Sequence, residues 1–427
     1  MMPFLRIGVD DTDSVSGMCT TYVGAVLEKR LLDMGLERLE PCHLVRLNPN
    51  CPFKTRGNAA VSLHFKASDV MVEEAVDMAV KTVEELYEKG FEETQPGVVV
   101  FHGQDVPSEW RLFALRAVRE MVELDEAVKL AERHGAQVFM FNGGRGVIGA
   151  LAAIACPLTN PTYEAIAYRV RKNWGTVRRI DKQSVIRLHE SGLSFDSYNP
   201  ETDEVRITPH TPCPVLAGVR SLTAENALKG LSMVRFLEEV EMVTVFATNQ
   251  ATDMHLAEKR LAEVKPFDNV IVTGHVASMP ETTVGGHVFF RLSDGVGEIT
   301  CAAYRPTGRL RHIVSLLRPG DVVKVMGGVK PKPQGNTLNI EKLQVIQLAQ
   351  HQMVRPPTCP SCGKRMDSAG FGKGFRCKSC RMRTNKPEIT VEERVLRPGF
   401  YEVSVSARRH LSKPLCIQDV SPTTNSQ

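Results

Sequence analysis

The sequence predicts a multidomain α+β protein, with an N-terminal α/β part, then a small five-stranded β-barrel, then a cysteine ribbon. The first observation is the length of 427 residues, which exceeds what one ordinary core can organise. The second is a change of character at residue 266, after which short β segments alternate with Gly, Pro and Asp turns up to residue 349. The third is a double CxxC pattern between residues 359 and 380.

The N-terminal part alternates between strand and helix patterns of apolar residues. These patterns predict strands at residues 4–9, 59–65 and 97–101 and helices at residues 19–35, 69–89, 108–119 and 123–134. Residues 139–155 predict a strand, a glycine-rich turn and a helix of small residues. We also predict a helix at residues 161–173, because Pro161 suits a helix start, and strands at 204–208 and within 233–249.

The C-terminal part is divided by its turns and prolines. Residues 266–349 hold five β segments with one helical stretch, residues 308–317, before the fourth, which is the order of an OB-type barrel. Pro356 and Pro357 mark a linker into the cysteine ribbon, which we assign to residues 356–410. The polar residues 411–427 predict a disordered tail.

Composition limits the class of protein. Hydrophobic content of 42% and charged content of 24% are typical of globular proteins. No apolar run is long enough to span a bilayer, and acidic residues stand where a signal peptide needs an apolar stretch. We therefore expect a cytoplasmic protein with no membrane partner, and no obligate protein partner is evident.

Charge is distributed unevenly along the chain. Residues 1–250 carry 27 Lys and Arg against 34 Asp and Glu, whereas residues 251–427 carry 26 against 15. A basic C-terminal half can attract a polyanion and hold its phosphates, although a solvated surface explains any single basic residue. The difference between the halves favours nucleic-acid binding in the C-terminal half.

An acidic motif follows the first predicted strand and consists of Asp10, Asp11 and Asp13. Like charges this close need cations, and such hard oxygen ligands suit Mg²⁺ that holds nucleotide phosphates. The next helix opens with a segment in which backbone N–H groups and hydroxyls can bind phosphate, namely Gly17, Thr20 and Thr21. An Asp-rich turn and a threonine N-cap are the structural alternatives. Because the two motifs are adjacent, a phosphate and metal site is the favoured interpretation.

Two further segments can bind phosphate. Lys54 and Arg56 stand beside Gly57 in a cationic turn, for which a solvated loop is an equal alternative. Residues 141–150 form a glycine-rich strand-to-helix turn with Gly143, Gly144, Arg145 and Gly146. The spacing is wrong for a dinucleotide site, and tight packing of small residues is a competing explanation for Gly149 and the alanines that follow it.

The two CxxC pairs predict a structural zinc site formed by Cys359, Cys362, Cys377 and Cys380. Four sulfurs leave no open position, so redox use is disfavoured, and an odd total of eleven cysteines argues against a disulfide framework. Phe371, Phe375 and Arg376 lie between the knuckles among further basic residues, which suits single-stranded RNA.

Aromatic and cationic residues also alternate in the predicted barrel strands, and these are Phe289, Phe290, Arg291, Tyr304 and Arg305. OB folds commonly use such side chains to stack on bases. Core packing explains part of this set, because alternate positions of a strand face inward.

The motifs taken together resemble the archaeal tRNA(Ile) agmatinylcytidine synthetases. The resemblance covers residues 4 to about 410 and is carried, in order, by GVDDTDS (8–14), GMCTTY (17–22), KTRGN (54–58), NGGRGVIGA (142–150), HTPCPVLAGVR (210–220) and TNQATDMH (248–255). It implies a kinase-like catalytic domain at residues 1–160 and a ferredoxin-like domain at 161–257, followed by the OB barrel and the zinc ribbon.

The resemblance also implies an activity. The family attaches agmatine to C2 of the wobble cytidine in the CAU anticodon of an isoleucine tRNA, so that AUA is decoded as isoleucine, and it consumes ATP to give AMP and phosphate. Phosphorylation of the poorly electrophilic C2 oxygen would create a leaving group for the agmatine amine, and such transfer needs Mg²⁺ and cationic clamps.

Residue roles follow from the resemblance. Asp10, Asp11 and Asp13 would hold metal or act as base, and Thr20 would be a phosphorylatable threonine. Lys54, Arg56 and the turn Gly143–Gly146 would hold phosphates. The agmatine pocket is expected between the catalytic region and segments 210–220 and 248–255, with Asp253 as a candidate ligand. The barrel and ribbon would grip the tRNA and its flipped base.

Two alternatives belong to other classes. One is a non-catalytic single-stranded nucleic-acid-binding protein built on the barrel and ribbon, against which the clustered carboxylates argue. The other is an ATP-dependent RNA base ligase that uses a different amine. ATP turnover that depends on tRNA separates the first alternative from the synthetase.

Overall fold

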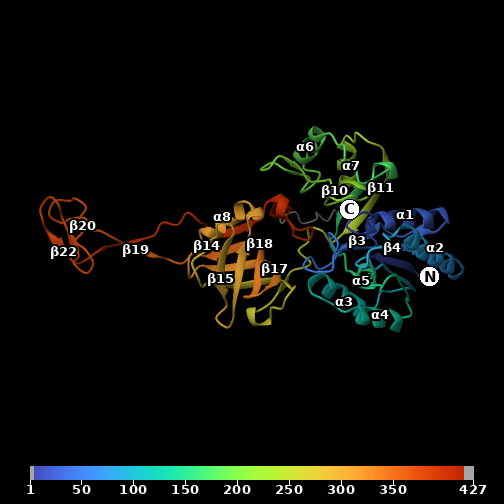
Figure 1. Cartoon of the computed structure of the whole chain (residues 1–427), viewed down its shortest axis with the longest axis horizontal. Helices are drawn as coiled ribbons and strands as arrows, with labels where there is room; N and C mark the ends of the chain where they lie inside the picture. The colour runs from blue at the N-terminus through green and yellow to red at the C-terminus, as the bar shows by residue number, and fades with distance from the viewer. Residues whose placement is uncertain (1–3, 418–427) are drawn as a thin grey trace, which may run out of the picture.

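The computed structural model describes residues 4–417 and has an elongated shape (Figure 1). The α/β part lies at one end, the barrel lies in the middle, and the ribbon projects at the other end. In this part of the chain no helix has the length and apolar character that crossing a membrane requires.

A mixed nine-stranded sheet organises the α/β part. Its strands are β1 (Phe4–Asp10), β2 (Glu37–Arg38), β3 (Cys42–Arg46), β4 (Ala59–Lys66), β5 (Gly97–Gly103), β6 (Gln137–Met140), β7 (Thr162–Arg169), β10 (Val215–Ser221) and β11 (Val240–Thr248). The order is β10-β7-β11-β3-β4-β1-β5-β6, and β2 also pairs with β4. Because β11 runs parallel to β3 and antiparallel to β7, one sheet continues through both predicted N-terminal domains.

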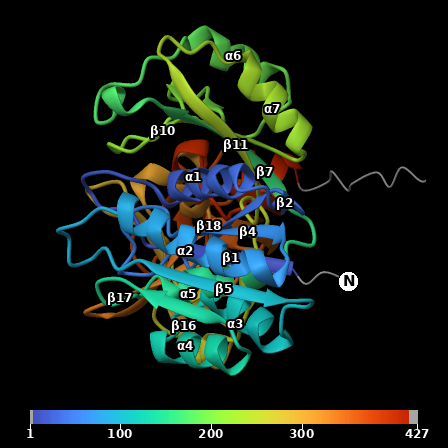
Figure 2. The ribbon, with the colours of Figure 1, turned by 90° about the vertical axis from the view of Figure 1, so that its right-hand side faces the viewer.

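Helices cover both faces of this sheet (Figure 2). They are α1 (Thr20–Asp33) and α2 (Asp69–Leu86) on one face, α3 (Ser108–Arg119), α4 (Leu124–Arg133) and α5 (Val147–Ala155) on the other, and α6 (Lys182–Glu190) and α7 (Ala224–Met233) over β7 and β10. A short hairpin, β8 (Tyr198–Asn199) with β9 (Glu204–Val205), follows α6.

The predicted helix at residues 161–173 is wrong. Residues Thr162–Arg169 form β7, and only the short 3-10 turn η1 (Arg171–Asn173) follows. Ala165 and Ala167 are buried in one core while Ile166 and Tyr168 are buried in another. A strand buried on both faces shows no polar alternation, so its sequence does not carry the usual strand signal.

Close packing between α5 and the sheet depends on glycines in β1 and β5. A Cβ on Gly8 would overlap the backbone carbonyl of Ala150 in α5, and one on Gly97 would overlap the start of α5 at Val147. Gly149 likewise leaves room for the carboxylate of Asp10. Small-residue packing, the competing explanation for the α5 alanines, is therefore present, and it brings the start of α5 against the end of β1.

We predict that Gly8→Ala lowers the free energy of unfolding by about 3 kcal/mol, because neither backbone can retreat and overpacking costs of this order. Chemical denaturation followed by circular dichroism measures the change. Gly285→Ala is the matched control, since the atoms nearest to its Cβ belong to the His287 side chain, at 3.3 Å. Equal stability of both variants would contradict the packing argument.

The barrel follows the predicted order. Its strands are β12 (Ala257–Glu258), β13 (Asn269–Val276), β14 (Glu281–Thr282), β15 (Val288–Ser293), β16 (Glu298–Ala303), β17 (Val322–Lys332), β18 (Gly335–Gln347) and β24 (Gly399–Glu402). Helix α8 (Arg309–Ser315) stands between β16 and β17, and pairing of β13 with β15 closes the barrel. The short turn η2 (Leu261–Glu263) precedes β13, and the short turn η3 (Arg305–Thr307) precedes α8.

The chain returns to the barrel after the ribbon. β24, inside the segment that we had assigned to the ribbon, pairs with β18, and η4 (Val405–Ala407) leads back toward the large sheet. The disordered tail predicted from residue 411 is wrong for residues 411–417, because Leu411 is 1% exposed in the α3–α5 core and η5 (Leu415–Ile417) follows. Residues 418–427 of that prediction lie outside the described residues.

The ribbon is held by two strands, β19 (Gln352–Arg355) and β23 (Glu388–Val391), which pair with each other. Three short strands form its body, namely β20 (Asp367–Ser368), β21 (Phe375–Arg376) and β22 (Arg383–Thr384). Figure 1 shows the ribbon standing clear of the other domains.

Candidate functional site

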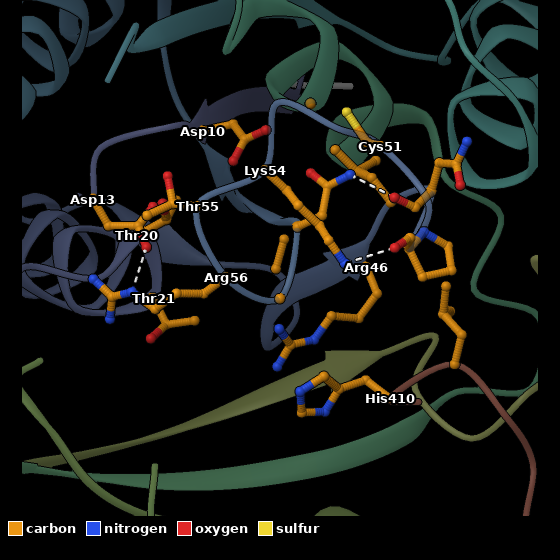
Figure 3. A pocket seen from close by; sticks show the side chains of 18 of the residues that line it. Asp10, Asp13, Thr20, Thr21, Arg46, Cys51, Lys54, Thr55, Arg56 and His410 are labelled. Carbon is orange, nitrogen blue, oxygen red and sulfur yellow. Dashed lines mark hydrogen bonds and ion pairs between the residues drawn. The ribbon is translucent and has the colours of Figure 1, made fainter. Parts of the chain in front are cut away.

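A cavity of about 900 Å³ lies where the acidic loop, the cationic turn, strands β7 and β10 and the returning C-terminal segment meet. The predicted site residues that line it are Asp10, Asp11, Asp13, Thr20, Thr21, Lys54, Arg56, Arg145 and Gly146. Figure 3 shows Asp10, Asp13 and Thr20 on one side of this pocket and Arg46 and His410 on another. Segments separated by more than a hundred residues are thus brought to one site.

The three aspartates are held by the turn that ends β1. Asp11 adopts a left-handed backbone conformation with φ of 59°, which Asp tolerates better than most residues. Its Oδ2 accepts hydrogen bonds from the Gln95 backbone N–H at 3.2 Å and from Arg145 Nη2 at 3.3 Å. Asp13 Oδ2 lies 3.1 Å from Arg56 Nε. Asp10 is 9% exposed.

Burial changes the acidity of this group. It raises the pKa of Asp10 well above its usual range, and the neighbouring charge of Asp11 adds to the effect. Burial also raises the pKa of Asp11, and it raises the pKa of Asp13 to about 6 although Arg56 opposes it. Asp10 is buried, Asp11 and Asp13 are partly buried, and all three line the cavity. Three carboxylates at one cavity are a donor set that fits a hard divalent cation such as Mg²⁺.

Thr20 stands at the first turn of α1 and faces the acidic loop. Its Oγ1 accepts a hydrogen bond from Thr12 Oγ1 at 3.1 Å, and the side chain is almost fully buried. Because Thr20 acts as acceptor in this contact, its own hydroxyl hydrogen remains available to a carboxylate or a phosphate. Thr21 also lines the cavity, with its Oγ1 3.1 Å from Cys19 Sγ.

Arg56 holds the acidic loop together. Its Nη2 donates to the carbonyl oxygens of Ser14, Gly17 and Met18 at 2.5 to 2.7 Å. Its Nε faces Asp13, and its Nη1 donates to Thr211 Oγ1 at 3.3 Å. These contacts engage all sides of the guanidinium, so the structure supports a positioning role for Arg56 in addition to the predicted phosphate contact.

Lys54 is the more available cation of that turn. Its Nζ donates to the carbonyl of Pro49 at 2.6 Å. Burial lowers the pKa of Lys54 to about 8, and the nearby charges of Arg409 and Lys330 add to the effect. An anion bound beside these three cations would restore the protonated state of the lysine.

The glycine-rich turn divides into two parts. Arg145 and Gly146 line the cavity, and Arg145 also donates to the Glu93 carbonyl at 2.7 Å and stacks over Phe53. Gly143 and Gly144, with φ of 101° and 69°, are not among the lining residues and shape the turn before α5. Gly17 is also outside the lining, where its carbonyl binds Arg56.

Several lining residues were missed from the sequence. They come from strands and loops outside the quoted motifs and include Arg46, Glu164, Asp196, Arg206, Lys330, Arg408, Arg409 and His410. The cations around His410, with Arg46 the strongest and burial next, lower the pKa of that histidine well below its usual range. An excess of partly buried cations on this side of the cavity is suited to phosphate groups.

Glu164 is a buried carboxylate among these cations. It stands in β7, is 8% exposed, and accepts a hydrogen bond on Oε2 from Gln250 Nε2 at 2.5 Å. Arg46 Nη2 lies 3.9 Å from the same oxygen. A Cβ on Gly218 would overlap Glu164 Oε1, so the glycine in β10 leaves room for that oxygen, and both residues line the cavity.

The two segments proposed to form the agmatine pocket are placed differently. Segment 210–220 contributes lining residues from His210 to Arg220, whereas segment 248–255 contributes none. The Asp253 carboxylate instead forms an ion pair with Lys342 of the barrel and accepts a hydrogen bond from the Lys413 N–H at 2.7 Å. The structure therefore gives Asp253 a role in holding the barrel against the α/β part.

The four ribbon cysteines form one cluster. Their sulfur atoms all lie within 4.8 Å of one another, with Cys359 Sγ 3.4 Å from Cys380 Sγ and Cys362 Sγ 3.4 Å from Cys377 Sγ. Gly363 and Arg381 take positive φ in the two knuckles and donate their N–H groups to the carbonyls of Cys359 and Cys377. This arrangement fits a tetrahedral zinc ion bound by four thiolates.

The surfaces proposed for nucleic acid are partly exposed. Phe371 of the ribbon is fully exposed, whereas Phe375 packs against the cysteine cluster. In the barrel Phe290 is 2% exposed and belongs to the core, so core packing is its correct explanation. Phe289 and Tyr304 are half-buried with ring centroids 6.0 Å apart, and they stay available for stacking.

An acidic, phosphate-suited cavity joined to an OB barrel and a four-cysteine ribbon defines an enzyme that acts on nucleic acid. Family models described as the TiaS TCKD domain match residues 6–69 and 65–143, and the TiaS FLD domain matches residues 144–255. The TiaS C-terminal zinc ribbon matches residues 356–396, and an OB-fold nucleic-acid-binding domain matches residues 270–346. The chain belongs to the TiaS family, the 2-agmatinylcytidine synthetases that act on an isoleucine tRNA.

Relatives match over nearly the whole chain. The 2-agmatinylcytidine synthetase TiaS of isoleucine tRNA from Pyrococcus horikoshii is 44% identical, with 97% of each chain covered. The protein of the same name from Archaeoglobus fulgidus is 40% identical with the same coverage. These identities confirm the resemblance drawn from the motifs.

Solved structures agree with the fold. A complex of TiaS with its isoleucine tRNA and ATP superposes with a TM-score of 0.89 at 39% identity, covering 99% of both chains. A complex of TiaS with the same tRNA, AMPCPP and agmatine superposes with a TM-score of 0.86 at 36% identity, covering 99% of this chain and 98% of that one. The kinase-like and ferredoxin-like domains, the OB barrel and the zinc ribbon of this chain are thereby established.

The domain boundary is set differently by packing and by the family models. The models meet at residues 143 and 144, in the turn before α5. We had placed the boundary after residue 160, and α5 packs on β1, β4 and β5 of the first domain. Both divisions cut the same sheet, so we keep residue 160 as a proposal based on packing.

Proposed function

We propose that this protein attaches agmatine to C2 of the wobble cytidine in the CAU anticodon of an isoleucine tRNA at the expense of ATP. Besides membership of the family, one observation carries the proposal. Three aspartates, of which Asp10 is buried, a buried threonine and a group of cations line one cavity of about 900 Å³. A protein that only binds RNA would not need this constellation. The tRNA substrate implies a cytoplasmic location.

The acidic and the basic residues of the cavity have different proposed roles. Asp10, Asp11 and Asp13 would hold Mg²⁺, and one of them would accept a proton. Lys54, Arg145 and the N–H groups at the starts of α1 and α5 would hold phosphates. Bound ATP would supply the transferable phosphoryl group, and bound Mg²⁺ would neutralise its charge.

The reaction on the base needs two steps. The cytidine C2 oxygen would accept the γ-phosphoryl group of ATP while the bond from the γ-phosphorus to the β-phosphate oxygen breaks. The phosphorylated C2 oxygen is then a leaving group. The primary amine of agmatine then forms the new C–N bond at C2 while the C–O bond breaks, phosphate leaves, and the amine proton passes to a carboxylate. Thr20, whose hydroxyl hydrogen is available beside the acidic loop, is proposed as the phosphorylatable threonine of this site.

We propose Glu164 as the partner of the agmatine guanidinium. Its Oε1 lies beside Gly218, both residues line the cavity, and a buried carboxylate is suited to a bidentate guanidinium contact. Glu164→Gln is expected to raise the KM for agmatine about 30-fold while the KM for ATP stays within twofold, since one charge-assisted contact contributes about 2 kcal/mol. Glu120→Gln, at the cavity rim, serves as control. An unchanged KM for agmatine would remove Glu164 from this role.

The proposed activity is tested by incubating the protein with ATP, Mg²⁺, agmatine and a transcript of the isoleucine tRNA with the CAU anticodon, followed by mass analysis of the wobble nucleoside. Gain of the agmatine group and ATP use that depends on tRNA are expected. Tight RNA binding with unmodified cytidine and no ATP use would favour the binding module, and incorporation of another amine in place of agmatine would favour the other ligase.

A further inference from the structure

A second group of metal-ligating side chains lies outside the catalytic cavity. Glu40, His43 and His64 each offer a ligand atom, and these atoms all lie within 4.8 Å of one another. None of the three lines the catalytic cavity. His43 stands in β3 and His64 in β4, while Glu40 stands in the bulge of residues 39–41, between β2 and β3, which both pair with β4. Figure 2 shows β2 alongside β4.

Hydrogen bonding fixes which nitrogen of His64 carries hydrogen. Ser62 Oγ lies 2.9 Å from His64 Nε2 and 2.9 Å from the Ala153 carbonyl oxygen at the end of α5. The residue four positions after Ala153 is Pro157, which has no N–H for that carbonyl. The single Ser62 hydrogen therefore goes to Ala153, and the hydroxyl oxygen accepts from His64 Nε2–H.

This assignment leaves His64 Nδ1 against a carboxylate. Nδ1 lies 3.1 Å from Glu40 Oε1, and in the neutral ring it carries a lone pair. Two lone pairs at this distance repel each other, so a proton or a metal ion must stand between them. His43 Nε2 approaches the other carboxylate oxygen, Glu40 Oε2, at 3.6 Å, and the two imidazole rings have centroids 4.2 Å apart.

We propose that Glu40, His43 and His64 form a second zinc-class divalent-metal site, in which Nδ1 of His64, Nε2 of His43 and the Glu40 carboxylate are the protein ligands. Zinc binds nitrogen and oxygen at about 2.0–2.2 Å, so neighbouring ligands of a tetrahedral ion lie about 3.4 Å apart. The 3.1 and 3.6 Å separations, each to a different Glu40 oxygen, are close to this spacing, and the ligand atoms of all three residues lie within 4.8 Å of one another. A proton would bridge one ring to Glu40, whereas a metal ion would bind both His64 Nδ1 and His43 Nε2.

The surroundings agree with such a site. The chain Ala153–Ser62–His64 orients the ligand from behind, as outer hydrogen bonds do in zinc centres. Arg6, which also faces Glu40, directs its donors to the carbonyls of Gly103 and Gln104 at 2.9 and 3.1 Å. The Glu40 side chain is 49% exposed, so water can complete the coordination. The ion would fix the bulge at residues 39–41 against β4.

Metal analysis of the whole chain tests the proposal. After exposure to zinc and dialysis, we expect two zinc ions per chain, one in the ribbon and one at this site. Glu40→Gln should hold one, and because Glu40 is on the surface the variant should keep its fold. Glu37→Gln, which removes an exposed carboxylate two residues before the bulge at 39–41, should still hold two. One zinc ion in wild type, or two in Glu40→Gln, would overturn the proposal.

Cobalt distinguishes the two sites by spectrum. Added to protein whose ribbon already holds zinc, Co²⁺ should give visible d–d absorption without a thiolate charge-transfer band, because the ligands are nitrogen and oxygen. His64→Gln should lose this absorption, and circular dichroism checks that the variant is folded. No absorption in wild type would show that a proton bridges Glu40 and His64, and would reject the metal site.

Discussion

Asp11→Asn is expected to lower tRNA-dependent ATP turnover and agmatine incorporation by about 10³-fold, or about 4 kcal/mol of barrier, because it removes a charge that would hold the metal ion. Asparagine keeps the shape of the side chain and its acceptor for the Gln95 N–H. It also tolerates the left-handed backbone at this position, which alanine would strain. Single-turnover kinetics with saturating tRNA measure the effect on chemistry.

Glu93→Gln is the matched control for that variant. Glu93 is exposed and is not among the residues that line the cavity, and its contact with Arg145 uses only the backbone carbonyl. It removes one negative charge in the same region without removing a ligand, so we expect activity within twofold of wild type. If both variants lost activity equally, the loss would reflect the overall charge of the rim. If neither did, Asp11 would not take part in the reaction.

The contiguous motifs were sufficient to predict one half of the cavity. Asp10, Asp11, Asp13, Thr20 and Thr21 are close in sequence, and a strand end followed by a helix start must bring them together. The strand-to-helix turn before α5 could be assigned to the same end of the sheet for the same reason. These residues all line the cavity or its edge.

The other half depends on tertiary contacts that no local pattern encodes. Arg46 and Glu164 stand in β3 and β7, whose strands meet only through β11. His410 arrives from a segment predicted to end the ribbon, and this return depends on β24 pairing with β18. A basic or acidic residue in a strand is usually solvated, so its sequence carries no sign that it is buried.

The barrel and ribbon were predicted with their element order for a different reason. Each is a short-range unit, in which Gly, Pro and Asp turns separate strands that pair with near neighbours, and paired cysteines fix the knuckles. The ribbon boundary was less predictable, because the strand that closes the arrangement comes after the ribbon in sequence and belongs to the barrel in space.

The fold of the ribbon depends on its zinc ion. Its buried apolar cluster consists, within the described chain, of Cys359, Met366 and Cys377 with Phe375 packed against them. So small a core cannot fold without a metal ion, and two strands alone connect the ribbon to the rest of the chain. Loss of the ion should therefore unfold the ribbon and leave the catalytic domains intact.

Cys377→Ser is expected to reduce the zinc content by one ion per chain and to lower agmatine incorporation into tRNA by about 100-fold or more. An unfolded ribbon loses its stacking and cationic contacts with the tRNA, and each stacked base contributes about 1–3 kcal/mol. ATP binding measured by calorimetry, and the main thermal unfolding transition, should stay unchanged, since none of the residues that line the cavity belongs to the ribbon. Cys416→Ser, at an exposed cysteine outside the cluster, should behave as wild type. If Cys377→Ser lost the zinc ion but still modified tRNA at the wild-type rate, the ribbon would be dispensable for presenting the wobble base, and the barrel would have to position the tRNA alone.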